Sequence, residues 1–208
     1  MVAVRKALIL VAILLLALLP VVRAESSGLY WAKSYGGSYG DVIKAVKVLP
    51  DGSIIAVGYT NSFGAGGDDA LVMKLNPDGS LAWAKTYGGK DSDGANAVAL
   101  APNGDIIVAG YTDSFGAGYE DVWVLRLDSN GNVKWQKTYG GSDEDVADAV
   151  ALAGNDIIVA GETWSFGAGT PKYSNAWVLR LDANGNVKGQ KNLRGKRLGC
   201  CQRGCYRS

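Results

Sequence analysis

Histidine is missing from all 208 residues of the chain. Its absence excludes Ser-His-Asp and Cys-His catalysis, together with every zinc site that uses a histidine ligand. Cysteine is nearly absent as well, because Cys200, Cys201 and Cys205 all lie within the last nine residues. The rest of the chain therefore has no disulfide framework and depends on packing alone. The three cysteines lack the fourth ligand of a closed zinc site, so we expect no metal there.

Long apolar runs are also scarce, and the one that exists lies at the N-terminus. Arg5 and Lys6 precede an apolar run over residues 7–19, and Val22 and Ala24 place small residues at the −3 and −1 positions of a cleavage site. This pattern predicts a secretory signal peptide over residues 1–24. An uncleaved membrane anchor is the alternative, but the run is short for a bilayer span of about 20 residues. We therefore expect a protein that is secreted or at the cell surface, with no membrane attachment after cleavage.

Positive charge is sparse in the body of the chain. Residues 25–189 hold 20 Asp and Glu against 12 Lys and Arg, a net charge of −8, whereas residues 190–208 hold six Lys and Arg and no acid. An acidic body argues against nucleic acid as the partner. The basic segment 190–208 is treated as a separate, disordered tail.

What the sequence does contain is an internal repeat. Trp31, Trp83 and Trp135 are spaced 52 residues apart, and the text around them recurs in three copies of about 29–80, 81–132 and 133–188. A fixed period of this length decides the fold before any single residue does. The middle copy contains four strand-like segments separated by turn residues, and they span residues 81–87, 95–100, 105–112 and 122–127.

The third of these segments selects the architecture. Residues 106–109 are consecutively apolar, so this strand must be covered on both faces, as happens when sheets stack face to face. Repeated four-stranded antiparallel sheets that stack around an axis are propeller blades. The sequence predicts an all-β partial β-propeller of about three blades in an open arc, preceded by a helical signal segment.

Three motifs carry a resemblance to a known family. WAKTYGG at Trp83, GYT-x-SFGAG at Gly110 and WVLRLD at Trp123 resemble the β-propeller repeats of bacterial and archaeal secreted or cell-surface proteins. The resemblance covers about residues 29–188. It implies the fold and an external location rather than a particular activity.

The repeat stops abruptly at Asn192. Reading Asn192-Leu193-Arg194-Gly195 one base out of frame permits Thr-Tyr-Gly-Gly, and the next shifted codons permit a text close to residues 142–151. We interpret the tail as the result of one inserted base near Lys191, in a gene that once encoded further blades. Repeats in the alternative frame of the downstream DNA would support this interpretation.

Three features could carry chemistry, and each has a structural reading that we favour. The SFGAG loops lack the Lys-Ser/Thr of a phosphate-binding loop and suit tight turns with positive φ. Acidic side chains in the turns could hold Ca²⁺, but none fits the EF-hand spacing, and aspartates in turns usually cap their own backbone. The repeated tryptophans could stack on sugars if exposed, but one per blade favours packing between blades. The acidic side chains are Asp41, Asp68, Asp69, Asp91, Asp93, Glu120, Asp121, Asp143 and Asp145, and the tryptophans are Trp31, Trp83 and Trp135.

The prediction for function is therefore a non-catalytic, exported module for binding or surface architecture, truncated from a longer propeller, with a protein or carbohydrate ligand. We predict no catalytic, cofactor-binding or metal-binding residues. The alternative is a fragment of a quinoprotein dehydrogenase, which binds PQQ and Ca²⁺ in a closed propeller. The spacing from Leu127 to Trp135 resembles the blade motif of those enzymes.

Overall fold

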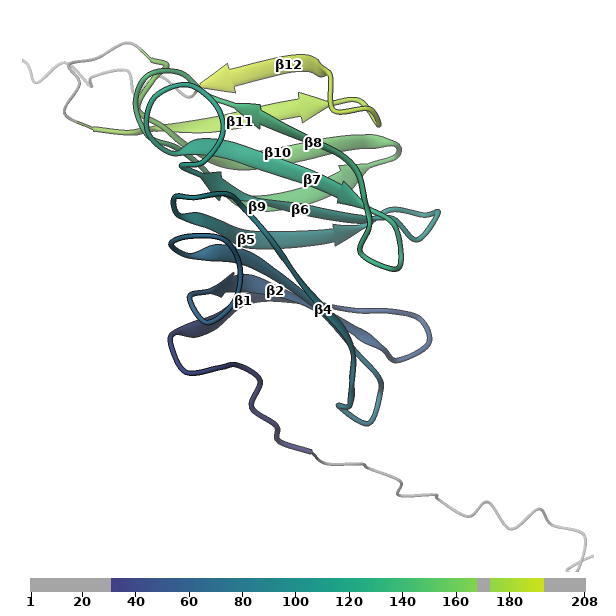
Figure 1. Ribbon diagram of the computed structural model, residues 1–208. Helices are drawn as coiled ribbons and strands as arrows, with labels where there is room; N and C mark the ends of the chain where they lie inside the picture. Colours follow the sequence, from purple (N-terminus) through teal and green to yellow (C-terminus); the bar gives the residue numbers. More distant parts are fainter. Residues whose placement is uncertain (1–30, 168–172, 193–208) are drawn as a thin grey trace, which may run out of the picture. The chain divides into compact units, whose positions relative to one another are not determined.

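The computed structural model describes residues 31–167 and 173–192 (Figure 1). Within these ranges the chain forms twelve strands and no helix, and thus no helix that could cross a bilayer. The predicted signal peptide, including its expected helix, lies outside the described residues. So does the predicted tail beyond Asn192.

The strands form three antiparallel sheets, each made of four strands in chain order. Blade 1 comprises β1 (Asp41–Val48), β2 (Ile54–Thr60), β3 (Asp69–Leu75) and β4 (Leu81–Tyr87). Blade 2 comprises β5 (Asp93–Leu100), β6 (Ile106–Thr112), β7 (Asp121–Leu127) and β8 (Val133–Tyr139). Blade 3 comprises β9 (Asp145–Ala153), β10 (Asp156–Thr163), β11 (Asn175–Leu181) and β12 (Val187–Asn192).

Sequence repeat and structural blade are out of phase by one strand. The segment that opens each predicted repeat, such as 81–87, is the fourth strand of the blade before it, because β4 pairs with β3 through a short turn at residues 76–80. The Gly88–Gly89 break then leads to the next sheet rather than back to the same one. The blades therefore run over residues 41–87, 93–139 and 145–192, not over the limits of the predicted repeats.

Hydrophobic side chains between the sheets hold the stack together. One core joins Ile55, Val57 and Val72 of blade 1 to Trp123 and Leu125 of blade 2, and all five are fully buried. A second core joins the opposite face of blade 2 to blade 3 in the same way. Blade 2 is thus covered on both faces, as the apolar run at residues 106–109 predicted. The fold is the all-β propeller-type stack expected from the sequence.

The first strands of the three sheets, β1, β5 and β9, lie next to one another and each contains a bulge. In β5 the bulge falls at Asn96, where a carbonyl of β5 turns towards β6. A Cβ on Gly110 would lie 2.0 Å from the carbonyl oxygen of Gly94, so only glycine fits opposite this bulge. Gly58 and Gly161 occupy the same place in the other blades.

The last strand departs from the predicted tail. Gln190, Lys191 and Asn192, which we assigned to the disordered segment 190–208, pair with β11 as the end of β12. Gln190 and Lys191 match Gln136 and Lys137 of the previous copy, and the strand pairing continues one residue further, to Asn192. Gly189 stands in β12 where β4 and β8 carry Trp83 and Trp135.

Candidate ligand-binding pocket between the second and third blades

The aspartate at the start of each first strand organises one corner of its blade. Asp93 accepts hydrogen bonds from the Gly89 amide at 2.8 Å, from the Ser114 hydroxyl at 2.7 Å and from the Thr112 hydroxyl. Asp41 receives the same set of bonds in blade 1, and its pKa is lowered, most of all by the Thr60 hydroxyl. These aspartates cap turns, as predicted.

A second aspartate caps the SFGAG loop in blades 1 and 2, and Asn175 occupies the equivalent position in blade 3. Asp121 accepts a hydrogen bond of 2.5 Å from the Ala117 amide, and Asp69 does the same for Ala65. Gly116 and Gly118 of this loop have φ of +107° and +108°, which agrees with the interpretation of SFGAG as a tight turn. The loop therefore has the geometry of a capped tight turn.

The two sets of aspartates meet between blades. A Cβ on Gly140 would lie 1.7 Å from an oxygen of Asp121 and 2.7 Å from an oxygen of Asp145, so both carboxylates flank this glycine. Burial raises the pKa of Asp121, and the charge of Asp145 raises it further. In the described part of the chain, no three acidic or cysteine side chains are grouped closely enough to hold a metal ion.

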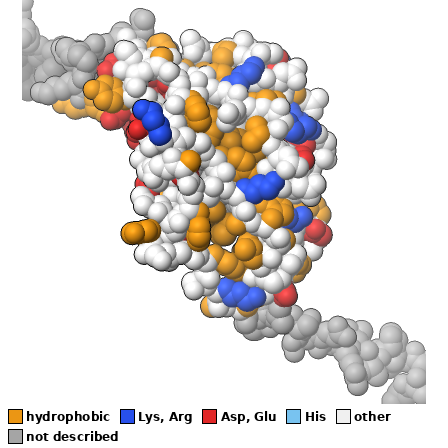
Figure 2. All heavy atoms as spheres, in the orientation of Figure 1, with side chains coloured by type: hydrophobic (Ala, Val, Ile, Leu, Met, Phe, Trp, Pro, Cys, Tyr) orange, Lys and Arg blue, Asp and Glu red, His pale blue; other side chains and the backbone are white. Residues whose placement is uncertain are grey.

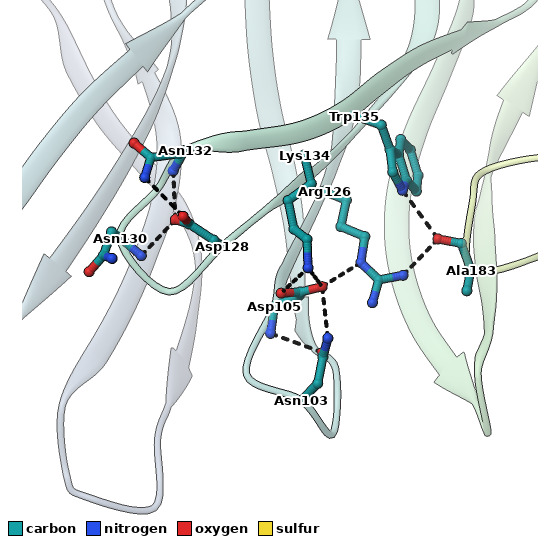
Figure 3. A network of polar contacts seen from close by, with 9 residues as sticks. All are labelled: Asn103, Asp105, Arg126, Asp128, Asn130, Asn132, Lys134, Trp135 and Ala183. Atoms are coloured by element: carbon teal, nitrogen blue, oxygen red, sulfur yellow. Dashed lines mark hydrogen bonds and ion pairs between the residues drawn. The ribbon is translucent and has the colours of Figure 1, made fainter.

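The repeated tryptophans pack against the following blade. Trp135 donates a hydrogen bond of 3.2 Å to the Ala183 carbonyl in the β11–β12 turn, and its ring lies 3.0 Å from where a Cβ on Gly185 would be (Figure 3). Trp83 covers Gly131 in the same manner. The indoles are half-buried between blades, which matches the predicted packing role.

The same region contains an ion-pair network (Figure 3). Asp105 accepts hydrogen bonds from Arg126 at 2.7 Å and from Lys134 at 2.8 Å, and Arg126 also donates to the Ala183 carbonyl of blade 3. Burial raises the pKa of Asp105, but the bonds from Lys134, Asn103 and Arg126 outweigh it and lower the pKa to about 2.

Figure 3 also shows Asp128 capping its own turn at Asn130 and Asn132. Asp128 and Trp135, which belong to the quinoprotein-like motif, are thus both engaged in structural contacts.

One pocket uses positions at which the repeats differ. Tyr119, Asp143, Glu144 and Trp164 line a pocket of about 290 Å³ between blades 2 and 3. The Trp164 amide donates to the Glu144 carbonyl at 2.8 Å, which brings the two loops together.

The corresponding corner between blades 1 and 2 has a different chemistry. Gly67, Asp91, Ser92 and Asp113 occupy the four equivalent positions there. Thus the structural Asp, Thr and Ser positions repeat in both corners, whereas three of the four pocket positions change type and both aromatic rings occur in the second corner alone.

Two acidic side chains, Asp143 and Glu144, line this pocket, and further carboxylates are coupled to them or to one another by charge. Burial raises the pKa of Glu120, next to Tyr119, and the charges of Asp113, Glu144 and Glu162 raise it further. Burial and the charge of Glu162 likewise raise the pKa of Asp148. Carboxylates that raise one another's pKa indicate a region of negative potential. A cation placed there would relieve the repulsion, and the rings of Tyr119 and Trp164 offer π faces to it.

Sequence reasoning found only part of this site. Asp143 was among the predicted acidic turn residues, and the structure places it in the pocket. The repeat pattern did not single out Tyr119, Glu144 and Trp164, because these residues do not repeat. Residues that recur in every blade report on the fold that the blades share. The signal that could have found them is the opposite one, namely the positions at which otherwise matching repeats diverge.

Comparison with known proteins supports the propeller assignment. Residues 49–81 and 101–133 match the family described as a domain of unknown function (DUF5122) beta-propeller. The two matched segments are one blade apart and cover equivalent strands and turns. These two segments of the chain are thus similar to a β-propeller family.

Three other similarities are more distant. Over 145 residues, the chain is 28% identical to the regulatory protein FlaEY of Caulobacter vibrioides, a match that covers 62% of this chain and 15% of that protein. Among solved structures, the Pyrococcus horikoshii acylaminoacyl peptidase aligns with a TM-score of 0.43 at 10% identity, over 74% of this chain and 25% of that one. The WD40 domain of Neurospora crassa Pan2 aligns with a TM-score of 0.32 at 16% identity, over 73% and 52% of the two chains. These two scores are low, so the fold assignment rests on the sheets themselves and on the family match.

Proposed function

We propose that this chain is an exported, non-catalytic β-propeller module that binds a cationic group of a protein partner in the pocket of Tyr119, Asp143, Glu144 and Trp164. The observation that carries the proposal is the contrast between repeats. Residues that hold the blades together recur, whereas the pocket places two aromatic rings beside acidic side chains, and the other corner has no ring at either position.

The chemistry of the pocket favours a lysine or arginine side chain. Tyr119 is 69% exposed and Trp164 is half-buried, so both rings are accessible from solvent. A cation over an exposed aromatic ring gains about 0.5–1 kcal/mol, and neighbouring carboxylates add Coulomb attraction. A carbohydrate, the other ligand class open from the sequence, would use the rings but would gain little from the surrounding negative charge.

A non-catalytic role has two further supports. The motif that resembles quinoprotein dehydrogenases is used for capping and packing at Asp128 and Trp135. The relative FlaEY is described as a regulatory protein. A dye-linked dehydrogenase assay with added PQQ and Ca²⁺ should give no turnover, and turnover would favour the enzymatic alternative.

Binding can be tested with small probes. Nα-acetyl-lysine methylamide and Nα-acetyl-arginine methylamide should shift the indole NMR signal of Trp164, and the shift should weaken as salt is added. Tyr119→Ala should weaken this response, which is still read at Trp164. Tyr39→Ala is the matched control, because Tyr39 is an exposed aromatic residue in the segment before β1 and should leave binding unchanged.

Two outcomes would contradict the proposal. Shifts at Trp164 with a neutral methyl glycoside but not with the basic probes would assign the pocket to carbohydrate. Equal responses in the wild type and in Tyr119→Ala would place cation binding elsewhere on the acidic surface.

A further inference from the structure

The two end faces of the stack are the two halves of an interface that occurs twice inside the chain. Within the stack, blade 1 packs its Ile55 and Val72 against Trp123 and Leu125 of blade 2, and blade 2 repeats this arrangement on blade 3. Blade 1 also has a back face, equivalent to the face of blade 2 that receives blade 1. Blade 3 has a front face, equivalent to the face of blade 1 that covers blade 2.

Equivalent residues show what each end face lacks. Val46 on the back face of blade 1 is 60% exposed, whereas the equivalent Val98 of blade 2 is 9% exposed. Val178 on the front face of blade 3 is 36% exposed, whereas the equivalent Val124 is fully buried. Pockets with apolar walls lie on both faces, one of about 520 Å³ beside Leu71 and Met73 and one of about 400 Å³ beside Ile158 and Val178.

Residues 31–35 already occupy part of a further blade. The Trp31 indole donates to the Pro77 carbonyl at 3.0 Å, and the Tyr35 hydroxyl donates to the Gly79 carbonyl. Trp135 and Tyr139 of β8 make the same two bonds to the turn of blade 3. Residues 31–35 therefore stand where the fourth strand of a blade before blade 1 belongs, and among the described residues they pair with no strand.

We propose that two copies of this chain associate head to tail, with blade 3 of each copy packed on blade 1 of the other. Each open face is then covered by the opposite end face of the other copy, and the contact is of the kind that already joins neighbouring blades within one chain. Such a heterologous contact closes into a ring when the rotation per contact allows it, and two copies give a ring of six blades. Propellers have about four to eight blades, so six is an ordinary number.

The ring requires one exchange of strands. In it, residues 31–35 of one copy and β12 of the other compete for the same place beside β11. β12 carries Gly189 where a tryptophan fills this place in β4 and β8, and residues 31–35 carry Trp31. We therefore expect residues 31–35 to replace β12 as the fourth strand of blade 3 in the other copy.

Light scattering on the full chain, separated by size at a series of concentrations, tests the association. The wild type should be a dimer. Val46→Asp and Val178→Asp should each give a monomer, because every interface in the ring would then bury one unpaired carboxylate. Val133→Asp is the matched control: Val133 is 47% exposed, its equivalents Leu81 and Val187 are similarly exposed at 49%, and it should remain a dimer.

Mixing the two disrupted variants distinguishes the arrangement. One of the two interfaces in a mixed ring is wild type on both sides, so an equimolar mixture of Val46→Asp and Val178→Asp should recover dimer. Trp31→Ala should weaken the dimer without unfolding the blades, as checked by circular dichroism. A monomeric wild type, a larger assembly, or loss of dimer in Val178→Asp but not in Val46→Asp would overturn the head-to-tail ring.

Discussion

The hydroxyl of Tyr87 in β4 donates a hydrogen bond of 2.6 Å to the carbonyl oxygen of Gly131, in the β7–β8 turn of the next blade. Tyr139 makes the equivalent bond to Gly185. Burial raises the pKa of Tyr87 to about 12, so the phenol stays protonated and remains a donor over the whole neutral range. This bond fixes the outer strand of one blade to a turn of its neighbour.

On the face seen in Figure 2, hydrophobic and Lys or Arg side chains occupy the centre, and carboxylates lie toward the margins.

Tyr87→Phe should destabilise the stack. The buried carbonyl of Gly131 would lose its partner, which costs about 1–3 kcal/mol. Urea unfolding followed by tryptophan fluorescence measures the loss. Tyr119→Phe removes an exposed hydroxyl instead and should change the free energy of unfolding by no more than about 0.5 kcal/mol. Equal effects of the two substitutions would show that the inter-blade bond contributes nothing.

Gly110→Ala should be severely destabilising for a different reason. The new Cβ would lie 2.0 Å from the carbonyl oxygen of Gly94, and a backbone carbonyl held by a strand bulge has little room to move. We expect a loss of about 1–3 kcal/mol, the usual range for overpacking. Gly40→Ala is the control, because a Cβ at Gly40 meets nothing within 4 Å. A Gly110→Ala protein as stable as Gly40→Ala would mean that the bulge is not formed as described.

Stability should pass through a maximum in mildly acidic solution. The pKa values of Asp69, Asp113, Glu120 and Asp121 are raised in the fold, first of all by burial, so the folded state takes up protons more readily than the unfolded chain. The free energy of unfolding should therefore rise as the pH falls from neutrality towards the ordinary carboxyl range of about 4.

Below that range the trend should reverse. The pKa of Asp105 is lowered from 3.8 to about 2, so its contribution is complete above the unfolded value and is lost as the pH falls towards 2. In Asp105→Asn, the free energy of unfolding should fall less steeply below about pH 4. Its rise between neutrality and about pH 4 should be unchanged. Unfolding titrations over this pH range measure both limbs, and an unchanged acid limb in the variant would falsify the assignment to Asp105.

The proposed signal peptide gives a further prediction. We propose cleavage after Ala24, so the mature chain should begin at Glu25. Mass spectrometry of protein recovered outside the expressing cell measures this end directly. Ala24→Leu replaces the small residue at the −1 position and should leave the segment attached. Recovery of an uncleaved wild-type chain in the membrane fraction would favour the anchor alternative instead.

Much of the fold follows from local pattern. The apolar run at residues 106–109 requires cover on both faces, and the structure supplies it by stacking blades on either side of β6. Turn residues such as Gly116, with φ of +107°, mark where strands end, because other residues rarely adopt that conformation. The predicted segment 81–87 coincides with β4, which ends where the Gly88–Gly89 break begins.

The phase of the blades did not follow from pattern. A periodic sequence can be divided at any point, and only the pairing of β4 with β3 decides that Trp83 closes a blade rather than opening one. Likewise Asn192 stands where the other copies carry Thr138 and Thr86, yet it pairs with Trp177, because backbone hydrogen bonds need no particular side chain.

The sequence by itself determined the unit of this protein: a four-stranded sheet that cannot hide its own apolar faces, repeated at a spacing of 52 residues. Tertiary structure alone decided which side chains meet across the sheets. Tyr119 and Trp164 are 45 positions apart and belong to different blades, and they line one pocket because stacking brings a loop of blade 2 against a loop of blade 3. Local preference sets the strands and turns, but a site built from two blades exists only once the blades have packed.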